Sequence, residues 1–283
     1  TLTKPAAPVA IVTPGKPVSY YLQQAGRYLL LSFIGAILLA PFILAALGSF
    51  KTGAEIIAFP PKLLPANWQI ENWIKVWTTD FGEGATFLRW LFNTAFLSVI
   101  IAVCQVIFCS MAAYAFARLR FPGQHSVFNF MLGTMMIPGA VTVIPAFVLM
   151  AKLGLLNTYW AIILPSLVSA GGIFMLTQFF KSIPRDLEEA AFMDGANRFQ
   201  IYKDVLLPLA RPALLTVFIL QFQAMWNNFL TPLLYLDSPR MWVLNVAIST
   251  LALGRPSAAV SLRQKYSFST LLDRSRPLGN WPI

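Results

Sequence analysis

Five long apolar runs, bordered by charged residues, alternate with polar segments along the chain. A helix needs about 20 apolar residues to cross a hydrocarbon core of roughly 30 Å, and each run reaches that length. The runs are Tyr28 to Phe50, Trp90 to Phe116, Val127 to Met150, Tyr159 to Phe180 and Ala213 to Tyr235. The pattern therefore predicts an all-α, polytopic transmembrane helical bundle with five clear spans.

A sixth span is left open by the same pattern. The segment 241–262 contains a shorter apolar run, from Trp242 to Leu253, which Arg255 and Pro256 then interrupt. Prolines also lie inside the five long runs, where neighbouring helices satisfy the carbonyl groups that a proline frees. These prolines are Pro41, Pro138, Pro145, Pro165 and Pro232. We expect five or six spans, several of them kinked.

Lysine and arginine set the orientation of the predicted spans, because they are enriched in cytoplasmic loops. With the N-terminus inside, ten of them fall on the cytoplasmic side, in 1–27, 117–126 and 181–212. Six fall on the external side, in 51–89, 151–158 and 236–241. We therefore expect a cytoplasmic N-terminus and interpret Arg118 and Arg120 as topology anchors.

This orientation divides the chain into three parts. Residues 1–27 are expected to form a flexible cytoplasmic arm, since the stretch up to Pro17 is rich in Pro and Thr and has little apolar content. Residues 28–262 form the transmembrane domain, which includes a cytoplasmic loop at 181–212. Residues 263–283 form a basic C-terminal tail.

The composition supports a membrane protein and excludes several other classes. Hydrophobic residues make up 57% of the 283 and charged residues only 11%, whereas soluble domains carry about 25% charged residues. The net charge of +10 is scattered between apolar runs, which suits anionic membrane lipid rather than a nucleic acid. With His125 as its one histidine and with Cys104 and Cys109 unsuitably spaced, the chain has no motif for catalysis or metal binding.

The acidic residues decide between ways of powering transport. None of the eleven falls inside a predicted span, whereas ion-coupled carriers usually keep a titratable carboxylate within the membrane. A secondary carrier is therefore disfavoured. The chain also lacks a phosphate-binding loop, so any ATP must be hydrolysed by another subunit.

The polar loop at 181–212 is patterned as two short helices. Ser182 is a plausible cap for the first, and Gly195 is placed to end it. Asn197 and Gln200 have the spacing of a capping box that begins the second. We predict two short amphipathic helices at the cytoplasmic face.

The first of these helices has a narrow face suited to a groove on a partner protein. Leu187, Ala190 and Ala191 follow the i, i+3, i+4 spacing of one face. Small residues at its centre allow close approach to the partner. The alternative is an ordinary solvated hairpin between two spans.

The loop also resembles a known pattern. Glu189-Ala190-Ala191, Gly195, Val205 and Leu207-Pro208, over twenty residues, are similar to the EAA loop of binding-protein-dependent ABC importer permeases, which usually have Ile at the position of Val205. Other segments resemble carbohydrate permeases of the MalG type: Asn93-Thr94, 113–123, 135–147, 153–165 and 226–234. Residues 255–283 depart from the family, which usually closes with a sixth helix and a short basic tail.

The resemblance implies a fold, a location and a set of partners. It implies the MetI-like permease fold in the bacterial cytoplasmic (inner) membrane. It further implies a second, MalF-like permease, two copies of a cytoplasmic ABC ATPase that binds ATP and Mg, and an extracytoplasmic sugar-binding protein. The residues that would couple to the ATPase are Glu189, Ala190, Ala191, Met193, Asp194, Gly195, Leu207 and Pro208.

Polar residues in the fifth run give a second candidate site. Gln223 and Asn227 share a helix face at i, i+4, and Trp226 can stack on a sugar ring. They are candidates for a substrate pathway, although hydrogen bonding between helices explains them as well. The functional hypotheses are a permease subunit of an ATP-powered sugar importer, an ion-coupled secondary carrier, and a membrane scaffold that does not transport.

Overall fold

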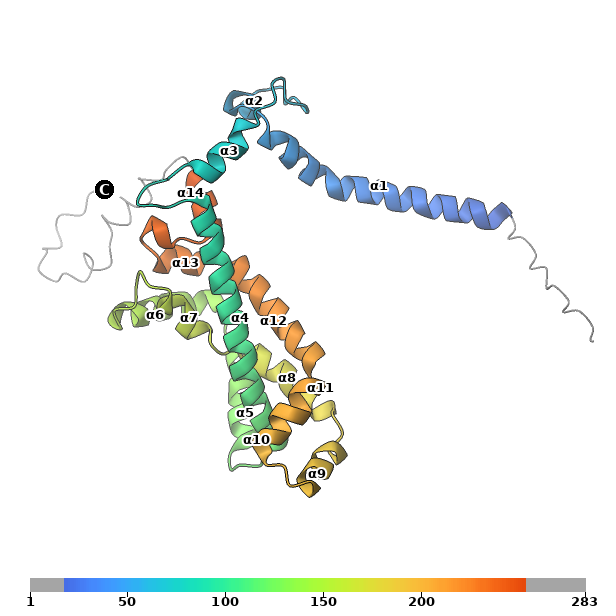
Figure 1. The fold of residues 1–283 in the computed structure, drawn as a ribbon, viewed down its shortest axis with the longest axis vertical. Coiled ribbons are helices and arrows are strands. Elements are labelled where there is room, and N and C mark those ends of the chain that lie inside the picture. The colour runs from blue at the N-terminus through green and yellow to red at the C-terminus, as the bar shows by residue number, and fades with distance from the viewer. Residues whose placement is uncertain (1–17, 253–283) are drawn as a thin grey trace, which may run out of the picture. The chain divides into compact units, whose positions relative to one another are not determined.

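The computed structural model describes residues 18–252, and these form helices and loops without a strand. The chain divides into two compact units, residues 1–76 and 77–283. Figure 1 labels the helices of both units.

The first unit contains one long helix and two short ones. They are α1 (Val18–Ser49), α2 (Gly53–Ile57) and α3 (Glu71–Thr78), whose last residues extend into the second unit. Thr52 and Glu55 form a capping box that begins α2. The Asn72 side chain donates to the carbonyl oxygens of Ser49 (3.1 Å) and Lys51 (3.0 Å), which ties α3 to the end of α1. Because α1 begins at Val18, residues 18–27 are helical, although the sequence placed them in the flexible arm.

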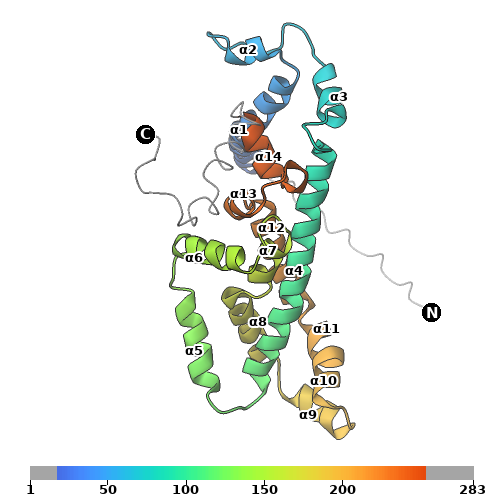
Figure 2. The ribbon, with the colours of Figure 1, turned by 90° about the vertical axis from the view of Figure 1, so that its left-hand side faces the viewer.

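The second unit is built along α4 (Phe87–Arg118), against which two other helices pack. These are α8 (Ala170–Ser182) and α12 (Arg211–Trp226), as Figures 1 and 2 show. The remaining helices are α5 (Gln124–Thr134), α6 (Gly139–Lys152), α7 (Trp160–Ile163), η1 (Leu164–Ser166), α9 (Asp186–Met193), α10 (Arg198–Gln200), η2 (Ile201–Leu206), α11 (Leu207–Leu209), α13 (Leu230–Tyr235), η3 (Pro239–Met241) and α14 (Leu244–Ala252).

Two hydrophobic clusters form the core of this unit, one toward each end of α4. The first surrounds Trp90 and Leu97, and the second surrounds Ala113 and Phe180. Helix α8 approaches α4 closely at Gly172, where a Cβ would lie 3.2 Å from the Cys109 sulfur. A small residue at this contact allows the backbones to pack as they do in membrane proteins.

The spans differ in part from the five that the sequence predicts. Three segments are long and apolar enough to cross a membrane: Ser19–Ser49, Phe87–Arg118 and Trp160–Ser182. Two further candidates are bent pairs, Gln124–Thr134 with Gly139–Lys152 at 100° and Arg198–Leu209 with Arg211–Trp226 at 77°. By length and composition, the described residues therefore contain three continuous candidate spans, or up to five if each bent pair counts as one.

Proline and local capping explain why two predicted runs are not single helices. Pro138 lacks an amide proton and disfavours helical geometry at the preceding residue, and the run 127–150 breaks between α5 and α6 at this point. The run 213–235 breaks after Trp226, where the Asn228 side chain accepts a hydrogen bond from the Thr231 amide. Of the possible sixth span, α14 is described, while residues 253–262 and the tail lie outside the described residues.

Candidate functional site

Helix α9 ends as the sequence predicts but begins differently. Gly195 follows its last turn with φ of +83°. The amides of Gly195 and Ala196 donate to the carbonyls of Phe192 and Ala191, both at 3.0 Å, which is the hydrogen-bond pattern of a Schellman motif. The predicted Ser182 cap is wrong, because Ser182 is the last residue of α8 and its hydroxyl donates to the carbonyl of Phe179.

The second short helix has the predicted capping box. The Gln200 amide donates to Asn197 Oδ1 at 2.9 Å, and the Asn197 amide donates to Gln200 Oε1 at 2.7 Å. From there the chain continues through η2, a π-helix, and through α11 to the bend that begins α12. The loop at 181–212 is therefore a series of short helices, in which Gly195 ends α9 and a capping box begins α10.

Most of the predicted coupling residues lie on the surface of this loop. The exposed ones are Glu189, Ala190, Met193, Asp194, Gly195 and Pro208. Ala191 and Leu207 are half-buried and pack against the second hydrophobic cluster. The prediction that Ala191 shares the outward face with Ala190 is therefore wrong, because its side chain belongs to the inner face of α9.

Large apolar side chains enlarge the exposed surface beyond the predicted residues. Met193 is 88% exposed, Phe199 65% and Phe192 43%. The guanidinium of Arg198 lies 5.6 Å from the centre of the Phe192 ring. Phe192 and Phe199 are not among the residues predicted from the sequence, although large apolar residues in an otherwise polar loop are a signal of an interaction surface.

The loop at 181–212 is held by one face of α4, at residues spaced by four. Ser110 Oγ lies 2.7 Å from the hydroxyl of Tyr202. The Tyr114 hydroxyl donates to the carbonyl of Arg198 at 3.2 Å. Both contacts link α4 to the second short helix or to η2, so the last turns of α4 fix where the loop sits. Figures 1 and 2 show α9 and α10 beside this end of α4.

Arg118 makes the third contact in this row, with the connection into α9 and with α9 itself. Its Nη2 donates to the carbonyl of Ile183 at 2.7 Å. Its Nε lies 2.5 Å from Oε1 of Glu188, and the two side chains are 4% and 11% exposed. Apart from this ion pair neither atom has a hydrogen-bond partner. From the sequence, Arg118 is interpreted as a topology anchor, and its pairing with Glu188 is not predicted.

The other end of α4 holds a different loop. The Asn93 side chain donates to the carbonyls of Arg240 (2.9 Å) and Trp242 (3.0 Å). Thr94 Oγ1 accepts from the amide of Leu244 at 2.8 Å, at the first residue of α14. Asn93 and Thr94, noted in the sequence for their resemblance, therefore anchor the segment 239–244.

The candidate substrate residues lie at the end of α12, and not all of their polar groups are free to bind a ligand. Gln223 and Asn227 are exposed and Trp226 is half-buried. The Asn227 side chain donates to the main-chain carbonyl of Gln223 at 3.0 Å, so it also caps its own helix. The Trp226 ring stacks on Phe222 with centroids 5.5 Å apart.

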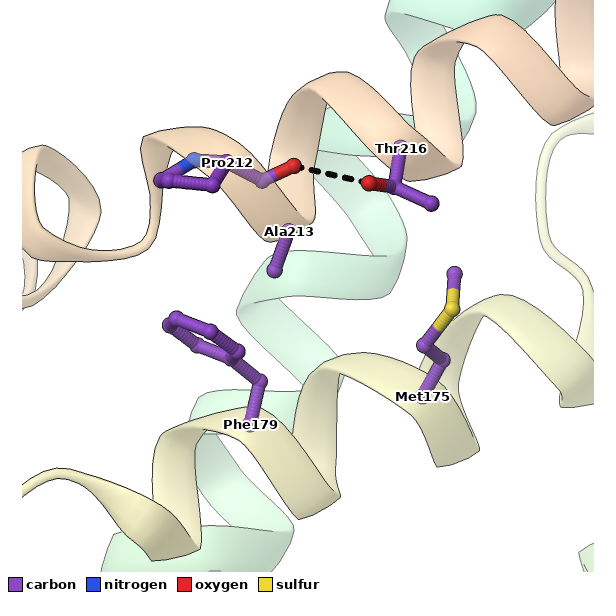
Figure 3. A pocket seen from close by; sticks show the side chains of 5 residues that line it. All are labelled: Met175, Phe179, Pro212, Ala213 and Thr216. Carbon is purple, nitrogen blue, oxygen red and sulfur yellow. Dashed lines mark hydrogen bonds between the residues drawn. The ribbon is translucent and has the colours of Figure 1, made fainter. Parts of the chain in front are cut away.

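A pocket of about 350 Å³ between α8 and α12 contains none of these three residues. Figure 3 shows Met175 and Phe179 of α8 pointing toward Ala213 and Thr216 of α12. Its lining is largely apolar, and the Thr216 hydroxyl donates to the carbonyl of Pro212 at 2.9 Å. The pocket therefore offers little hydrogen bonding to a hydroxyl-rich ligand. Within residues 18–252 no cluster of His, Cys, Asp and Glu could hold a metal ion.

Comparison with known proteins places this arrangement in context. Residues 105–272, more than half of the chain, match the family "Binding-protein-dependent transport system inner membrane component". The chain is 35% identical over 222 residues to the arabinooligosaccharides transport system permease protein AraQ of Halalkalibacterium halodurans, covering 78% of each. It is 33% identical over 225 residues to the diacetylchitobiose uptake system permease protein NgcG of Streptomyces coelicolor, covering 79% of this chain and 72% of that protein.

A solved structure shares both the fold and part of the sequence. It is the crystal structure of a bacterial ABC transporter involved in the import of the acidic polysaccharide alginate. The match has a TM-score of 0.71 and 26% identity, and covers 92% of this chain and 88% of that one.

Proposed function

We propose, from the premise that this chain belongs to the family of binding-protein-dependent inner membrane transport components, that it is the permease subunit of an ATP-binding-cassette importer for an oligosaccharide. The relatives support the substrate class, since those named above serve arabinooligosaccharides and diacetylchitobiose. The solved relative imports a polysaccharide. Neutral and acidic sugars both fall within this range.

The observation that carries the proposal is the exposed surface of α9, held on α4. Met193 and Ala190 are exposed there beside Glu189, and an apolar surface with acidic residues beside it suits a groove on a partner protein. The partner we propose is a cytoplasmic ABC ATPase in two copies, which binds ATP and Mg²⁺. A second, MalF-like permease completes the pore, and an extracytoplasmic binding protein delivers the sugar.

In this assembly the chain itself performs no covalent chemistry. It provides helices that line or support the pathway, and it passes the motion of the ATPase to them through the loop at 181–212. Gln223, Trp226 and Asn227 are the residues of this chain that we propose for contact with the sugar. The N-terminus is proposed to lie in the cytoplasm of a bacterium, on the same side as this loop.

An ion-coupled carrier and a scaffold without transport are the alternatives. The three continuous candidate spans contain no Asp or Glu, which leaves no carboxylate there to bind a driving ion. ATP-dependent uptake in vesicles that is insensitive to an uncoupler separates the importer from the carrier. Substrate-stimulated ATP hydrolysis separates it from the scaffold.

The direct test is reconstitution of both permeases, the ATPase and the binding protein in liposomes. Glu189→Lys reverses a charge on the exposed face of α9 and should lower both co-purification of the ATPase and stimulated ATP hydrolysis. Glu71→Lys is the matched control, because Glu71 is also exposed and pairs with Lys75 on its own helix, at 3.8 Å. The proposal fails if the wild-type complex neither retains an ATPase nor accumulates an oligosaccharide.

A further inference from the structure

Arg118 and Glu188 form a buried ion pair, and stability of the fold alone does not explain why charged residues occupy these two positions. The guanidinium and the carboxylate are almost fully covered, with 4% and 11% of the side chains exposed. Burying two charges costs desolvation, which their attraction only partly repays, and apolar residues of similar volume often stabilise a protein as well. Such pairs are best attested where they fix a specific geometry.

The geometry that this pair fixes is the position of α9 relative to α4. Arg118 is the last residue of α4, and Glu188 lies in the first turn of α9. Between α8 and α9 the chain runs through Ile183, Pro184 and Arg185. The same guanidinium holds the Ile183 carbonyl, so one side chain binds both this connection and the helix that follows it.

The ion pair lies on the inner face of α9, toward α4, and does not involve the exposed face of this helix. Glu188 is buried, whereas its neighbour Glu189, about a quarter-turn further round the helix, is exposed. Ala191, three residues after Glu188, adds an apolar contact on the same inner face. The two adjacent glutamates are therefore divided, one toward α4 and the other toward solvent.

We infer that Arg118 is a positioning residue that locks α9 to the end of α4, so that a displacement of α9 moves α4 with it. Without this lock the connection through Ile183 and Pro184 bends, and α9 moves while α4 stays. The inference rests on the proposed function, since it names how force applied at the exposed face of α9 reaches a membrane span.

The test separates coupling from assembly by measuring sugar molecules imported per ATP hydrolysed. The variants are Arg118→Gln, Glu188→Gln and the charge exchange that combines Arg118→Glu with Glu188→Arg. Arg120→Gln is the matched control, because Arg120 is exposed two residues after the end of α4 and its replacement removes the same charge. All are measured in the complete complex in liposomes, with co-purification of the ATPase recorded for each.

We expect the single variants to retain the ATPase, because the exposed face of α9 is unchanged. Their import per ATP should fall roughly tenfold, which lies within the usual range of about 5- to 150-fold for coupling between two sites. The control should match the wild type, and the charge exchange should recover most of the loss. Wild-type ratios in both single variants would overturn the inference while leaving the proposed function intact.

A second measurement covers the case in which the exchanged charges pack badly. Cysteines at positions 118 and 188, in a background without Cys104 and Cys109, are bridged by a short bifunctional thiol reagent. Recovery of import per ATP on bridging supports the lock. Failure of both the exchange and the bridge to restore it, with the ATPase still bound, refutes it. If the wild-type complex itself shows no ATP-driven import, it is the proposed function that has failed.

Discussion

Gly195 is the position where one added side chain should most directly weaken docking of the proposed ATPase. Its φ of +83° lies in the left-handed region, which costs an L-residue roughly 1–2 kcal/mol. A Cβ at this position meets no atom within 4 Å. The cost of Gly195→Val therefore comes from the backbone alone and not from a clash with neighbouring side chains.

The magnitude follows from when this cost is incurred. In the undocked loop the open surroundings let the turn of the Gly195→Val variant relax to another backbone conformation, and docking then imposes the native turn again. The cost falls on association, so the ATPase should bind about 5- to 30-fold more weakly at 25 °C. Gly195→Asn should lose less, because Asn adopts left-handed geometry more readily.

Gly154 provides a control with the same local structure at another place. It follows α6 with φ of +67°, and a Cβ there also meets nothing within 4 Å. The amide of Leu155 donates to the carbonyl of Met150 at 3.0 Å, again as in a Schellman motif. Gly154→Val thus carries the same backbone cost away from α9.

The assay is the dissociation constant of the ATPase from the purified permease pair, followed by uptake in liposomes. Gly195→Val should weaken binding and lower uptake, whereas Gly154→Val should leave binding unchanged. Equal affinity of the ATPase for the wild type, Gly195→Val and Gly154→Val would refute the argument that the left-handed turn is needed for docking. Equal weakening by both valine variants would show that the effect is general destabilisation.

Three other predictions concern topology, substrate and stability. A cysteine replacing Arg198 in a background without native cysteines should be shielded from an impermeant thiol reagent in intact cells, and one replacing Lys62 should react; labelling at 198 from outside would contradict the proposed orientation. Gln223→Ala combined with Trp226→Ala should leave the complex assembled but lower uptake or change sugar preference, and wild-type uptake and selectivity would mean that these residues only pack. Asn93→Ala removes two hydrogen bonds to the 239–244 segment and should lower the free energy of unfolding by about 1–3 kcal/mol, seen as a lower thermal midpoint; an unchanged midpoint would show that the segment is held by other contacts.

Local signals carried the sequence predictions that the structure confirms. Two such signals are Gly195 at the end of α9 and the capping box formed by Asn197 and Gln200. Each depends on residues within one helical turn of each other, so the sequence displays it directly. The apolar runs of α1 and α4 are equally local, because continuous hydrophobicity over a helix is enough to identify them.

Contacts between distant segments explain what the sequence did not reveal. Arg118 and Glu188 are seventy positions apart, and nothing in either neighbourhood indicates that they meet. The inward direction of Ala191 depends on where α4 lies, which hydrophobic spacing within α9 does not specify. The break at Pro138 was expected only as a kink, because a proline within an apolar run tells where a helix weakens but not by how much it bends.

The length of α4 has a consequence for how such proteins can be recombined. Its 32 residues extend about 48 Å at 1.5 Å per residue, against a hydrocarbon core of roughly 30 Å. A chimera that takes the 181–212 loop from a relative would place foreign side chains against Ser110, Tyr114 and Arg118. The smallest transplantable segment therefore begins in the last turns of α4 and ends at α12, so that natural exchange or engineering should preserve residues 110–212 as one block.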